Sequence, residues 1–268
     1  MASVSQSGAK SNQEPGVASL STGQQYRKAE SLSRIMFRRF FKHRMAVIGV
    51  LLLSLIIGYV TIGTLVYSER DANRTSIRQR FESPSSEFPM GTDEAGRNVM
   101  ARTIYGGQIS LMIGVTAVAI SISLGTTIGL LSGYFGGWVD SLLMRFVEAL
   151  LAIPTLVLLL VLSRMLQDIS ADTVTILGRQ LSASVVAIIV IIGLTTWMGL
   201  SRIVRSLVLT LKEQEFVTAA RALGAGNLRI LVTHILPNCI APIVVAATLG
   251  VGSAIITETA LSFLGFGV

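Results

Sequence analysis

The stretch "GTTIGLLSG", residues 125–133, places a glycine at every fourth position of a long uncharged run. At 3.6 residues per helical turn, Gly125, Gly129 and Gly133 would lie on one face of a helix. Small residues spaced in this way let a second helix approach closely, and this pattern is typical of helices that pack inside a membrane. The stretch therefore predicts a close helix–helix contact, either within this chain or with a second subunit.

The composition around this stretch is that of a membrane protein. Hydrophobic residues make up 51% of the 268 residues and charged residues 14%, whereas a soluble domain carries about 25% charged residues. Crossing a bilayer core takes about 20 apolar residues. Five runs meet this length, and only the third contains charges, Arg145 and Glu148 near one end. They are 45–68, 103–139, 141–163, 180–201 and 235–257. We predict an all-α integral membrane protein with five spans.

Several chemistries are excluded by the residues present. The chain has one cysteine, Cys239, and two distant histidines, His43 and His234, so it cannot form an internal disulfide or a Cys/His zinc cluster. It also lacks the Gly-x4-Gly-Lys-Ser/Thr loop that binds nucleotide phosphates. No constellation of nucleophile and base is evident. We therefore expect neither an enzyme nor a bound cofactor.

The net charge of +7 is unevenly distributed along the chain. Eight of the 22 Lys and Arg residues precede the first span, and five more lie between the fourth and fifth spans. Because basic residues near spans favour the cytoplasmic side, the N-terminus is expected inside, residues 69–102 outside and residues 202–234 inside. This topology, together with attraction to anionic lipid, explains the charge, and no nucleic-acid partner is expected.

The same pattern suggests a division of the chain into segments. Residues 1–30 are predicted to be a disordered cytoplasmic tail, and residues 31–68 an amphipathic segment followed by the first span. Residues 69–102 form the extracytoplasmic loop, which could contact a binding protein or only be solvated. Residues 103–268 form the core domain, with a cytoplasmic loop at 202–237.

That cytoplasmic loop contains "EQEFVTAARALGAGNLRILVTHILPN", residues 213–238. We expect a helix over 212–223 that Gly224 and Gly226 end, then a second helical stretch over 228–235 that ends at Pro237. The first helix would carry one narrow apolar stripe, made of Phe216, Ala219, Ala220 and Leu223. The stripe is too rich in alanine for strong lipid anchoring. The segment is either a plain connector or a docking element for another protein.

Here the sequence resembles the permease subunits of binding-protein-dependent ABC importers. Their cytoplasmic motif is Glu-Ala-Ala, three residues, Gly, nine residues, Ile-any-Leu-Pro. The chain matches it with Ala219, Ala220, Gly224, Leu236 and Pro237. Thr218 replaces the usual Glu and His234 the usual Ile, while the carboxylate of Glu215 lies about one turn earlier.

Other stretches resemble the peptide and nickel branch of this family. "GTDEAGRNVMARTIYGGQISLMIG" (91–114), "GYFGGWVDSLLMRFVEALLAIP" (133–154) and "TETALSFLGFG" (257–267) are similar to segments of its core domain, with Asn98 where Asp is usual. The basic segment and first span resemble the extra module of the C-type subunit, which pairs with a longer B-type partner. The resemblance covers residues 31 to 268.

The resemblance implies a type I ABC importer fold in the cytoplasmic membrane and a set of partners. These are a second permease subunit, two cytoplasmic ATPase subunits and an extracytoplasmic substrate-binding protein. The substrate would be a di- or oligopeptide, with nickel as the alternative within the branch and a stand-alone secondary transporter as the alternative outside it. The family has six spans, so a sixth is expected to be missing from this chain. ATPase coupling is expected from Glu215, Phe216, Ala219, Ala220, Leu223, Gly224, Leu236 and Pro237.

Charged and kinking residues inside the spans are the remaining candidates. Glu258 lies near the outer end of the fifth span, as a pathway residue or as a solvated or threonine-bonded boundary residue. Arg145 and Glu148, three residues apart, are expected to pair with each other. Pro154 is expected to kink the third span.

Overall fold

The structure, a computed structural model, describes residues 40–167, 174–176, 179–181 and 183–266. It divides the chain into two units, Met1–Leu55 and Ile56–Val268. The predicted tail and nearly all of the amphipathic segment lie outside the described residues. The long helices are α2 (Arg44–Val66), α4 (Val99–Phe135), α5 (Gly137–Leu151), α6 (Thr155–Gln167), α7 (Ala183–Leu211) and α10 (Leu236–Leu261). The boundary between the units falls inside α2.

The predicted all-α membrane architecture is confirmed, with one modification. Four helices are long and apolar enough to cross a membrane: α2, α4, α7 and the helix that contains α10. The predicted span at 141–163 is not one straight helix, because α5 and α6 meet at an angle of 86°. Counting this bent pair as one span gives five.

The break between α5 and α6 falls at the proline that the sequence singles out. α5 ends at Leu151 and α6 begins at Thr155, directly after Pro154. Proline has no backbone N–H and its ring clashes with the preceding turn, so a helix cannot continue straight through it. The kink predicted at Pro154 is therefore confirmed, and it amounts to a sharp turn.

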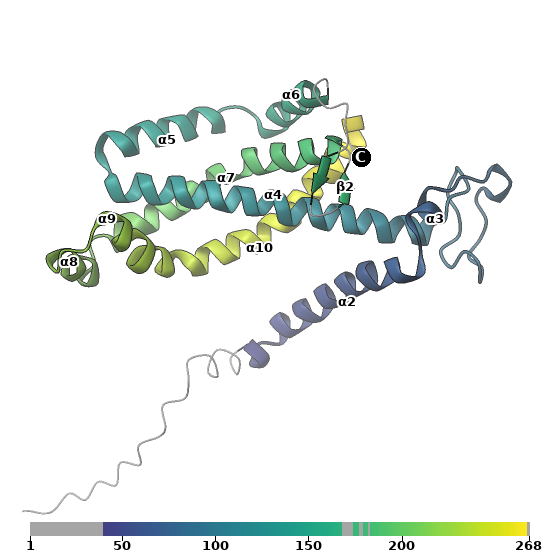
Figure 1. Cartoon of the computed structure of the whole chain (residues 1–268), viewed down its shortest axis with the longest axis horizontal. Helices are drawn as coiled ribbons and strands as arrows, with labels where there is room; N and C mark the ends of the chain where they lie inside the picture. The colour runs from purple at the N-terminus through teal and green to yellow at the C-terminus, as the bar shows by residue number, and fades with distance from the viewer. Residues whose placement is uncertain (1–39, 168–173, 177–178, 182, 267–268) are drawn as a thin grey trace, which may run out of the picture. The chain divides into compact units, whose positions relative to one another are not determined.

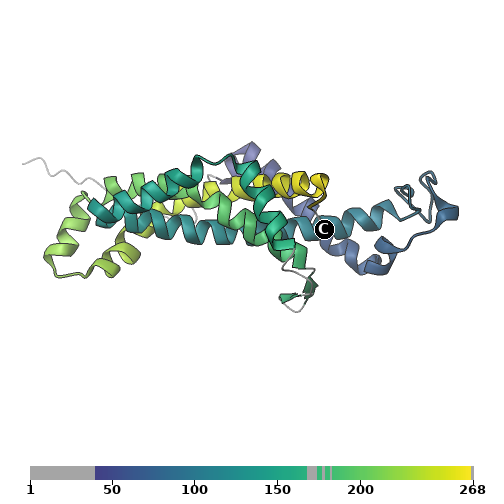
Figure 2. The ribbon, with the colours of Figure 1, turned by 90° about the horizontal axis from the view of Figure 1, so that it is seen from above.

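Three helices, α4, α7 and α10, lie side by side and form the centre of the larger unit (Figure 1, Figure 2). α7 is the innermost of them. In its most apolar stretch of 18 residues, 61% of the residues are buried, against 33% for α4 and 11% for the helix that contains α10. One core cluster joins these helices to α6 through fully buried side chains such as Ile113, Leu159, Ile192 and Leu261. α7 is therefore the helix that the others surround.

The glycines at 125, 129 and 133 form the contact between α4 and α7. A Cβ atom built on Gly129 would lie 2.6 Å from the backbone oxygen of Ser201 and 2.7 Å from Cβ of Val204. A Cβ atom on Gly125 would lie 2.8 Å from the oxygen of Trp197, and one on Gly133 would lie 2.7 Å from Cβ of Val208. No side chain fits between the two backbones at these levels. The close contact predicted from the sequence is therefore made within the chain.

An ion pair joins the same helices at the end of this contact. Arg205 of α7 donates from Nε and Nη2 to the two carboxylate oxygens of Asp140, over 2.5 and 2.6 Å. The hydroxyl of Ser132, beside Gly133 on α4, donates to the same carboxylate. Bidentate Arg–carboxylate pairs are among the stronger hydrogen-bonded contacts and fix orientation. The turn from α4 into α5, where Gly136 and Gly137 take positive φ angles of 63° and 53°, is thus fixed to α7.

The fifth span begins earlier than predicted, because Pro237 does not end a helix. α9 (Asn227–Arg229) continues into a π-helical segment, η2 (Ile230–Ile235), and then directly into α10. In η2 the N–H of Leu236 bonds the oxygen of Leu231, five residues back. Pro237 stands in the first turn of α10, where a missing N–H costs little. The wider π turn therefore accommodates the proline without a break.

The segment between α6 and α7 adds a small hairpin that the sequence analysis did not predict. β1 (Val174–Ile176) pairs antiparallel with β2 (Arg179–Leu181), with Thr175 opposite Gln180. It follows α6 and precedes α7, so it connects two helices of the core.

We predict that Gly129→Ala destabilises the chain although alanine is the better helix former. The added methyl group meets backbone rather than a flexible side chain, so α4 and α7 must separate, which costs about 1–3 kcal/mol. Gly106→Ala on the same helix is the matched control, because nothing lies within 4 Å of its Cβ position. Thermal unfolding of the detergent-purified protein should show a lower midpoint for the first variant only. Equal midpoints for the two variants would contradict the proposed role of Gly129.

Candidate functional site

The short helix α8 (Glu215–Ala222) lies between α7 and α9, at the end of the bundle where α4 turns into α5 (Figure 1). Tyr134 of α4 donates to the side-chain oxygen of Asn227 over 2.9 Å. This bond holds the start of α9, the segment that follows α8, at that end of the bundle. The helix is shorter than the predicted 212–223, because residues 212–214 form the turn that leaves α7. α8 is thus connected to α7 and to α9 by two short segments.

One face of α8 is fastened to the core. Val217 is fully buried and Ala220 is 9% exposed. Both belong to a cluster that includes Val204 and Val208 of α7, Ile230 and Ile235 of η2, and Cys239 of α10. The inner face of α8 therefore packs against η2, in a cluster to which α7 and α10 also contribute. A displacement of α8 would be passed to α7 and α10 through these side chains.

A second face of α8, adjacent to the buried one, is apolar and exposed. Leu223 is 89% exposed and Phe216 41%, and Ala219 lies beside them at the surface. Leu228, just beyond the helix, is 75% exposed. Burying a large apolar side chain is worth about 1.5–3 kcal/mol, so a patch of this kind at a bundle end is typical of a surface that another protein covers.

The end of α8 has the geometry expected from its glycine. Gly224 has φ +82°, the left-handed conformation, and its N–H bonds the oxygen of Arg221 over 3.0 Å. The N–H of Ala225 bonds the oxygen of Ala220 over 3.0 Å. These two bonds form a Schellman motif, which satisfies the last carbonyl groups of the helix and reverses the chain. Gly226, by contrast, has φ −69° and precedes α9 as its N-cap.

The residues predicted to form one docking stripe are therefore divided between two faces. Ala220 lies on the inner face, against the core of its own chain, and so does not belong to an exposed stripe. Leu236 is half-buried and Pro237 lies in the first turn of α10. The exposed residues of the predicted set are Glu215, Phe216, Ala219, Leu223 and Gly224 on or beside α8, and Pro237 on α10. Val217, which the sequence analysis passed over, is the inner anchor.

At the other end of α10, Glu258 is buried rather than solvated. Its side chain is 7% exposed, and its carboxylate accepts from the hydroxyls of Ser110 on α4 and Ser262, over 3.1 and 2.8 Å. Thr257 and Thr259 bond backbone oxygens of α10 instead. The expectation of a solvated or threonine-bonded residue is therefore wrong, because two serines supply the donors. Ser262, one turn after Glu258, could have been found from its spacing, but Ser110 could not.

A pocket of about 500 Å³ opens between α5 and α7. Glu148 of α5 and Arg202 and Arg205 of α7 supply its charged groups, and Met144, Gly199, Ile203 and Ser206 complete its lining. The predicted pair of Arg145 with Glu148 is not made: within the described ranges, neither side chain forms an ion pair. Glu148 points instead to the side of α5 that faces α7.

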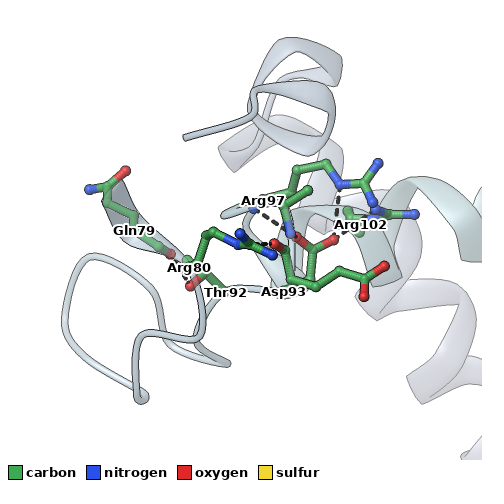
Figure 3. A network of polar contacts seen from close by, with 8 residues as sticks. Gln79, Arg80, Thr92, Asp93, Arg97 and Arg102 are labelled. Carbon is green, nitrogen blue, oxygen red and sulfur yellow. Dashed lines mark hydrogen bonds and ion pairs between the residues drawn. The ribbon is translucent and has the colours of Figure 1, made fainter. Parts of the chain in front are cut away.

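The loop over 69–102 has a fixed structure rather than a loose one (Figure 3). Asp93 accepts from the backbone N–H groups of Ala95 and Arg97 and from the guanidinium groups of Arg97 and Arg102, over 2.8 to 2.9 Å. Thr92 donates to the oxygen of Gln79 and accepts from the N–H of Glu82. These contacts join the start of the loop to its end, directly before α4.

Gly96 and the helix cap Asn98 also stabilise the structure of this loop. A Cβ on Gly96, which has φ +73°, would collide with the oxygen of Ser76 at 1.8 Å. Asn98 caps α4 by accepting from the N–H groups of Met100 and Ala101, over 3.0 and 3.2 Å. The aspartate that is usual at this position in similar sequences would cap the helix in the same way. The replacement by asparagine therefore preserves the N-cap of α4.

The charge state of Asp93 follows from its contacts. Burial acts to raise its pKa, but the N–H groups of Arg97 and Ala95 and the Arg97 guanidinium outweigh this effect, and the pKa falls from 3.8 to about 2. Each of these donors favours the ionised carboxylate. The loop is therefore held by a charge that persists over the whole physiological pH range.

Comparisons with known proteins agree with the geometry. Residues 125–268 match the family model of the binding-protein-dependent transport system inner membrane component. Residues 31–84 match the model of the N-terminal TM domain of oligopeptide transport permease C. The two matches together cover most of the chain.

Individual relatives extend across both matched regions. A dipeptide transport system permease protein of Alkalihalophilus pseudofirmus is 38% identical over 234 residues, which is 87% of this chain and 72% of the relative. An oligopeptide transport system permease protein of Bacillus subtilis is 35% identical over 242 residues, 90% of this chain and 74% of the relative. An oligopeptide transport system permease protein of Haemophilus influenzae is 37% identical over 234 residues, which is 86% of this chain and 70% of the relative.

We predict that Glu258→Ala destabilises the protein and that Glu258→Gln does not. Alanine leaves the hydroxyls of Ser110 and Ser262 without their acceptor, at a cost of about 1–3 kcal/mol. Glutamine keeps a side chain that can bond both hydroxyls. Thermal unfolding in detergent should place the glutamine variant near the wild type and the alanine variant below it. If the glutamine variant were as unstable as the alanine variant, the bonding described here would not account for the buried acid.

We predict that the stabilisation from Asp93 is lost in acid. Its folded pKa lies below its unfolded value, so the contribution is complete above pH 3.8 and disappears as the pH falls from 3.8 to about 2. The unfolding midpoints of the wild type and of Asp93→Asn should therefore converge over that interval. A gap between the midpoints that stayed constant with pH would contradict this role.

Proposed function

The chain belongs to the family of binding-protein-dependent transport system inner membrane components, and we propose that it couples peptide import to ATP hydrolysis by separate subunits. It would be the C-type permease of an ABC importer for di- or oligopeptides. Relatives that are permeases of dipeptide and oligopeptide systems support the substrate class. The chain would work in the cytoplasmic membrane with its N-terminus inside.

The observation that carries the proposal is that α8 has one buried apolar face and, next to it, one exposed apolar face. The inner face, Val217 and Ala220, lies in one core cluster with residues of α7, η2 and α10, while the outer face, Phe216, Ala219 and Leu223, is exposed. A connector that only joined two spans would not need an exposed leucine and phenylalanine beside the face that packs on the core. α8 therefore has the two surfaces that a coupling element requires, one for a partner and one for its own bundle.

The proposed mechanism transmits force through packed side chains. An ATPase subunit in the cytoplasm would cover the outer face of α8, and closure of the ATPase pair on ATP would move the helix. Because Val217 and Ala220 share a core cluster with Val208 of α7, Ile230 of η2 and Cys239 of α10, the movement would reach α7 and α10 together. Interfaces between packed helices shift between discrete arrangements, which suits alternating access.

The remaining partners would lie on the other side of the membrane or beside the chain. A second permease subunit would complete the pathway. The loop over 69–102, which Asp93 and Thr92 hold in a fixed form, would lie outside, where a substrate-binding protein delivers the peptide. The core domain would comprise residues 103–268, with residues 202–237 as the coupling loop.

We predict that Leu223→Asp uncouples transport. Leu223 is 89% exposed, so the change should not disturb folding, but it would place a charge in an apolar interface. Losing about 1.4 kcal/mol or more of docking energy weakens engagement tenfold or more. ATP-driven peptide uptake by the reconstituted importer should fall by that factor, whereas the chain should still insert and assemble with its partner permease.

The matched control is Thr218→Glu, which adds the same charge to the same helix. Thr218 is exposed and stands where members of the family carry glutamate, so uptake should be retained. Uptake that survived Leu223→Asp, or that fell equally in both variants, would contradict the docking of this face.

A further inference from the structure

The pocket between α5 and α7 contains two oppositely charged side chains, Glu148 and Arg202, and Arg205 is near enough to Glu148 to interact with it electrostatically. Its third charged group, Arg205, is bound by the carboxylate of Asp140. Glu148 and Arg202 are both exposed, and in the part of the chain that the structure describes neither side chain has a hydrogen bond or an ion pair. The pocket therefore offers one negative and one positive charge to a ligand.

These two charges lie at the same level of the bundle. With a rise of 1.5 Å per residue, Glu148 stands about 16 Å from the start of α5 and Arg202 about 14 Å from the end of α7. Those two helix ends are adjacent, since Asp140 of the first turn of α5 pairs with Arg205. Glu148 lies inside the predicted third span, where charged residues are costly and are retained mainly where they serve a pathway or a binding site.

The rest of the pocket has the size and lining of a small-molecule site. Its volume of about 500 Å³ falls within the range of roughly 300–1,000 Å³ that ligand pockets occupy. Met144 and Ile203 supply apolar surface, and Ser206 a hydroxyl. Gly199 leaves open space, because nothing lies within 4 Å of its Cβ position.

We propose that this pocket binds a short peptide with free ends during its passage, with Arg202 holding the carboxylate and Glu148 the ammonium group. The inference rests on the proposed function as a peptide permease and adds the residues that contact the substrate. A zwitterion matches the pair of opposite charges, and its backbone and side chains match the apolar lining. A ligand with only one charge would pair with Glu148 or with Arg202, but not with both.

The test uses Ser206→Cys in the complete reconstituted importer. The native chain has a single cysteine, Cys239, which is buried, so a thiol reagent reports on the introduced residue in the pocket. Labelling of this chain should slow severalfold when dialanine is added at millimolar concentration. N-acetyl-dialanine amide, which lacks both charges, should not slow it. Protection should be lost when Glu148→Gln or Arg202→Gln is introduced, and kept in Arg145→Gln, a change on α5 outside the pocket.

The outcomes separate this proposal from the function on which it rests. If the wild-type complex imports dialanine but dialanine and the blocked peptide act alike on labelling, the pocket is not the peptide site while the importer function stands. If the wild-type complex imports no peptide, both proposals fail. Protection that follows the phosphatidylethanolamine content of the vesicles, or that persists in both glutamine variants, would also overturn the assignment.

Discussion

The backbone contact between α4 and α7 is the constraint on which the rest of the larger unit depends. At Gly125, Gly129 and Gly133 the helices approach so closely that a Cβ atom would collide with backbone oxygens or with Val208. Inside a bilayer, where lipid tails are as apolar as leucine, close packing of this kind is a main source of helix association. The contact brings Ser132, Asp140 and Arg205 together at its end. α10 packs against both α4 and α7.

The proposed coupling follows from that arrangement. Val204 and Val208 of α7, which meet Gly129 and Gly133 of α4, also belong to the cluster that contains Val217 of α8. A push on α8 would therefore act on the innermost helix of the bundle. The pocket with Glu148 and Arg202 lies between α5 and the same helix. One rigid element would thus connect the proposed ATPase contact to the proposed peptide site.

Much of this fold could be predicted from the sequence, because local rules decide it. The lengths of the apolar runs predicted the spans. Pro154 predicted the break between α5 and α6, and Gly224 predicted the end of α8. The glycine spacing predicted a helix contact but not its partner, since small residues fit any helix that approaches. Pro237 was misjudged because a π turn, which has no simple sequence rule, accommodates it.

Long-range contacts account for the other differences in the candidate site. Glu258 was expected to reach water or threonine, but Ser110, 148 residues earlier in the chain, provides one of its donors. On α8 the spacing gave a single stripe, yet Phe216 and Val217 are both apolar and adjacent. Only the packing against Val208 and Cys239 shows that Val217 and Ala220 face inward and Phe216 outward. The inner and outer faces of a short helix are thus set by tertiary contacts.

The central claim is that an ATPase subunit covers the outer face of α8. A bifunctional thiol cross-linker on Leu223→Cys tests it most directly, because the native Cys239 is buried. In the assembled importer the account predicts a cross-link from residue 223 to an ATPase subunit, absent when the cysteine is placed at Ile77 in the loop over 69–102. Two results together would contradict the account. They are free reaction of residue 223 with soluble thiol reagents in the intact, transporting complex, and no cross-link to an ATPase subunit.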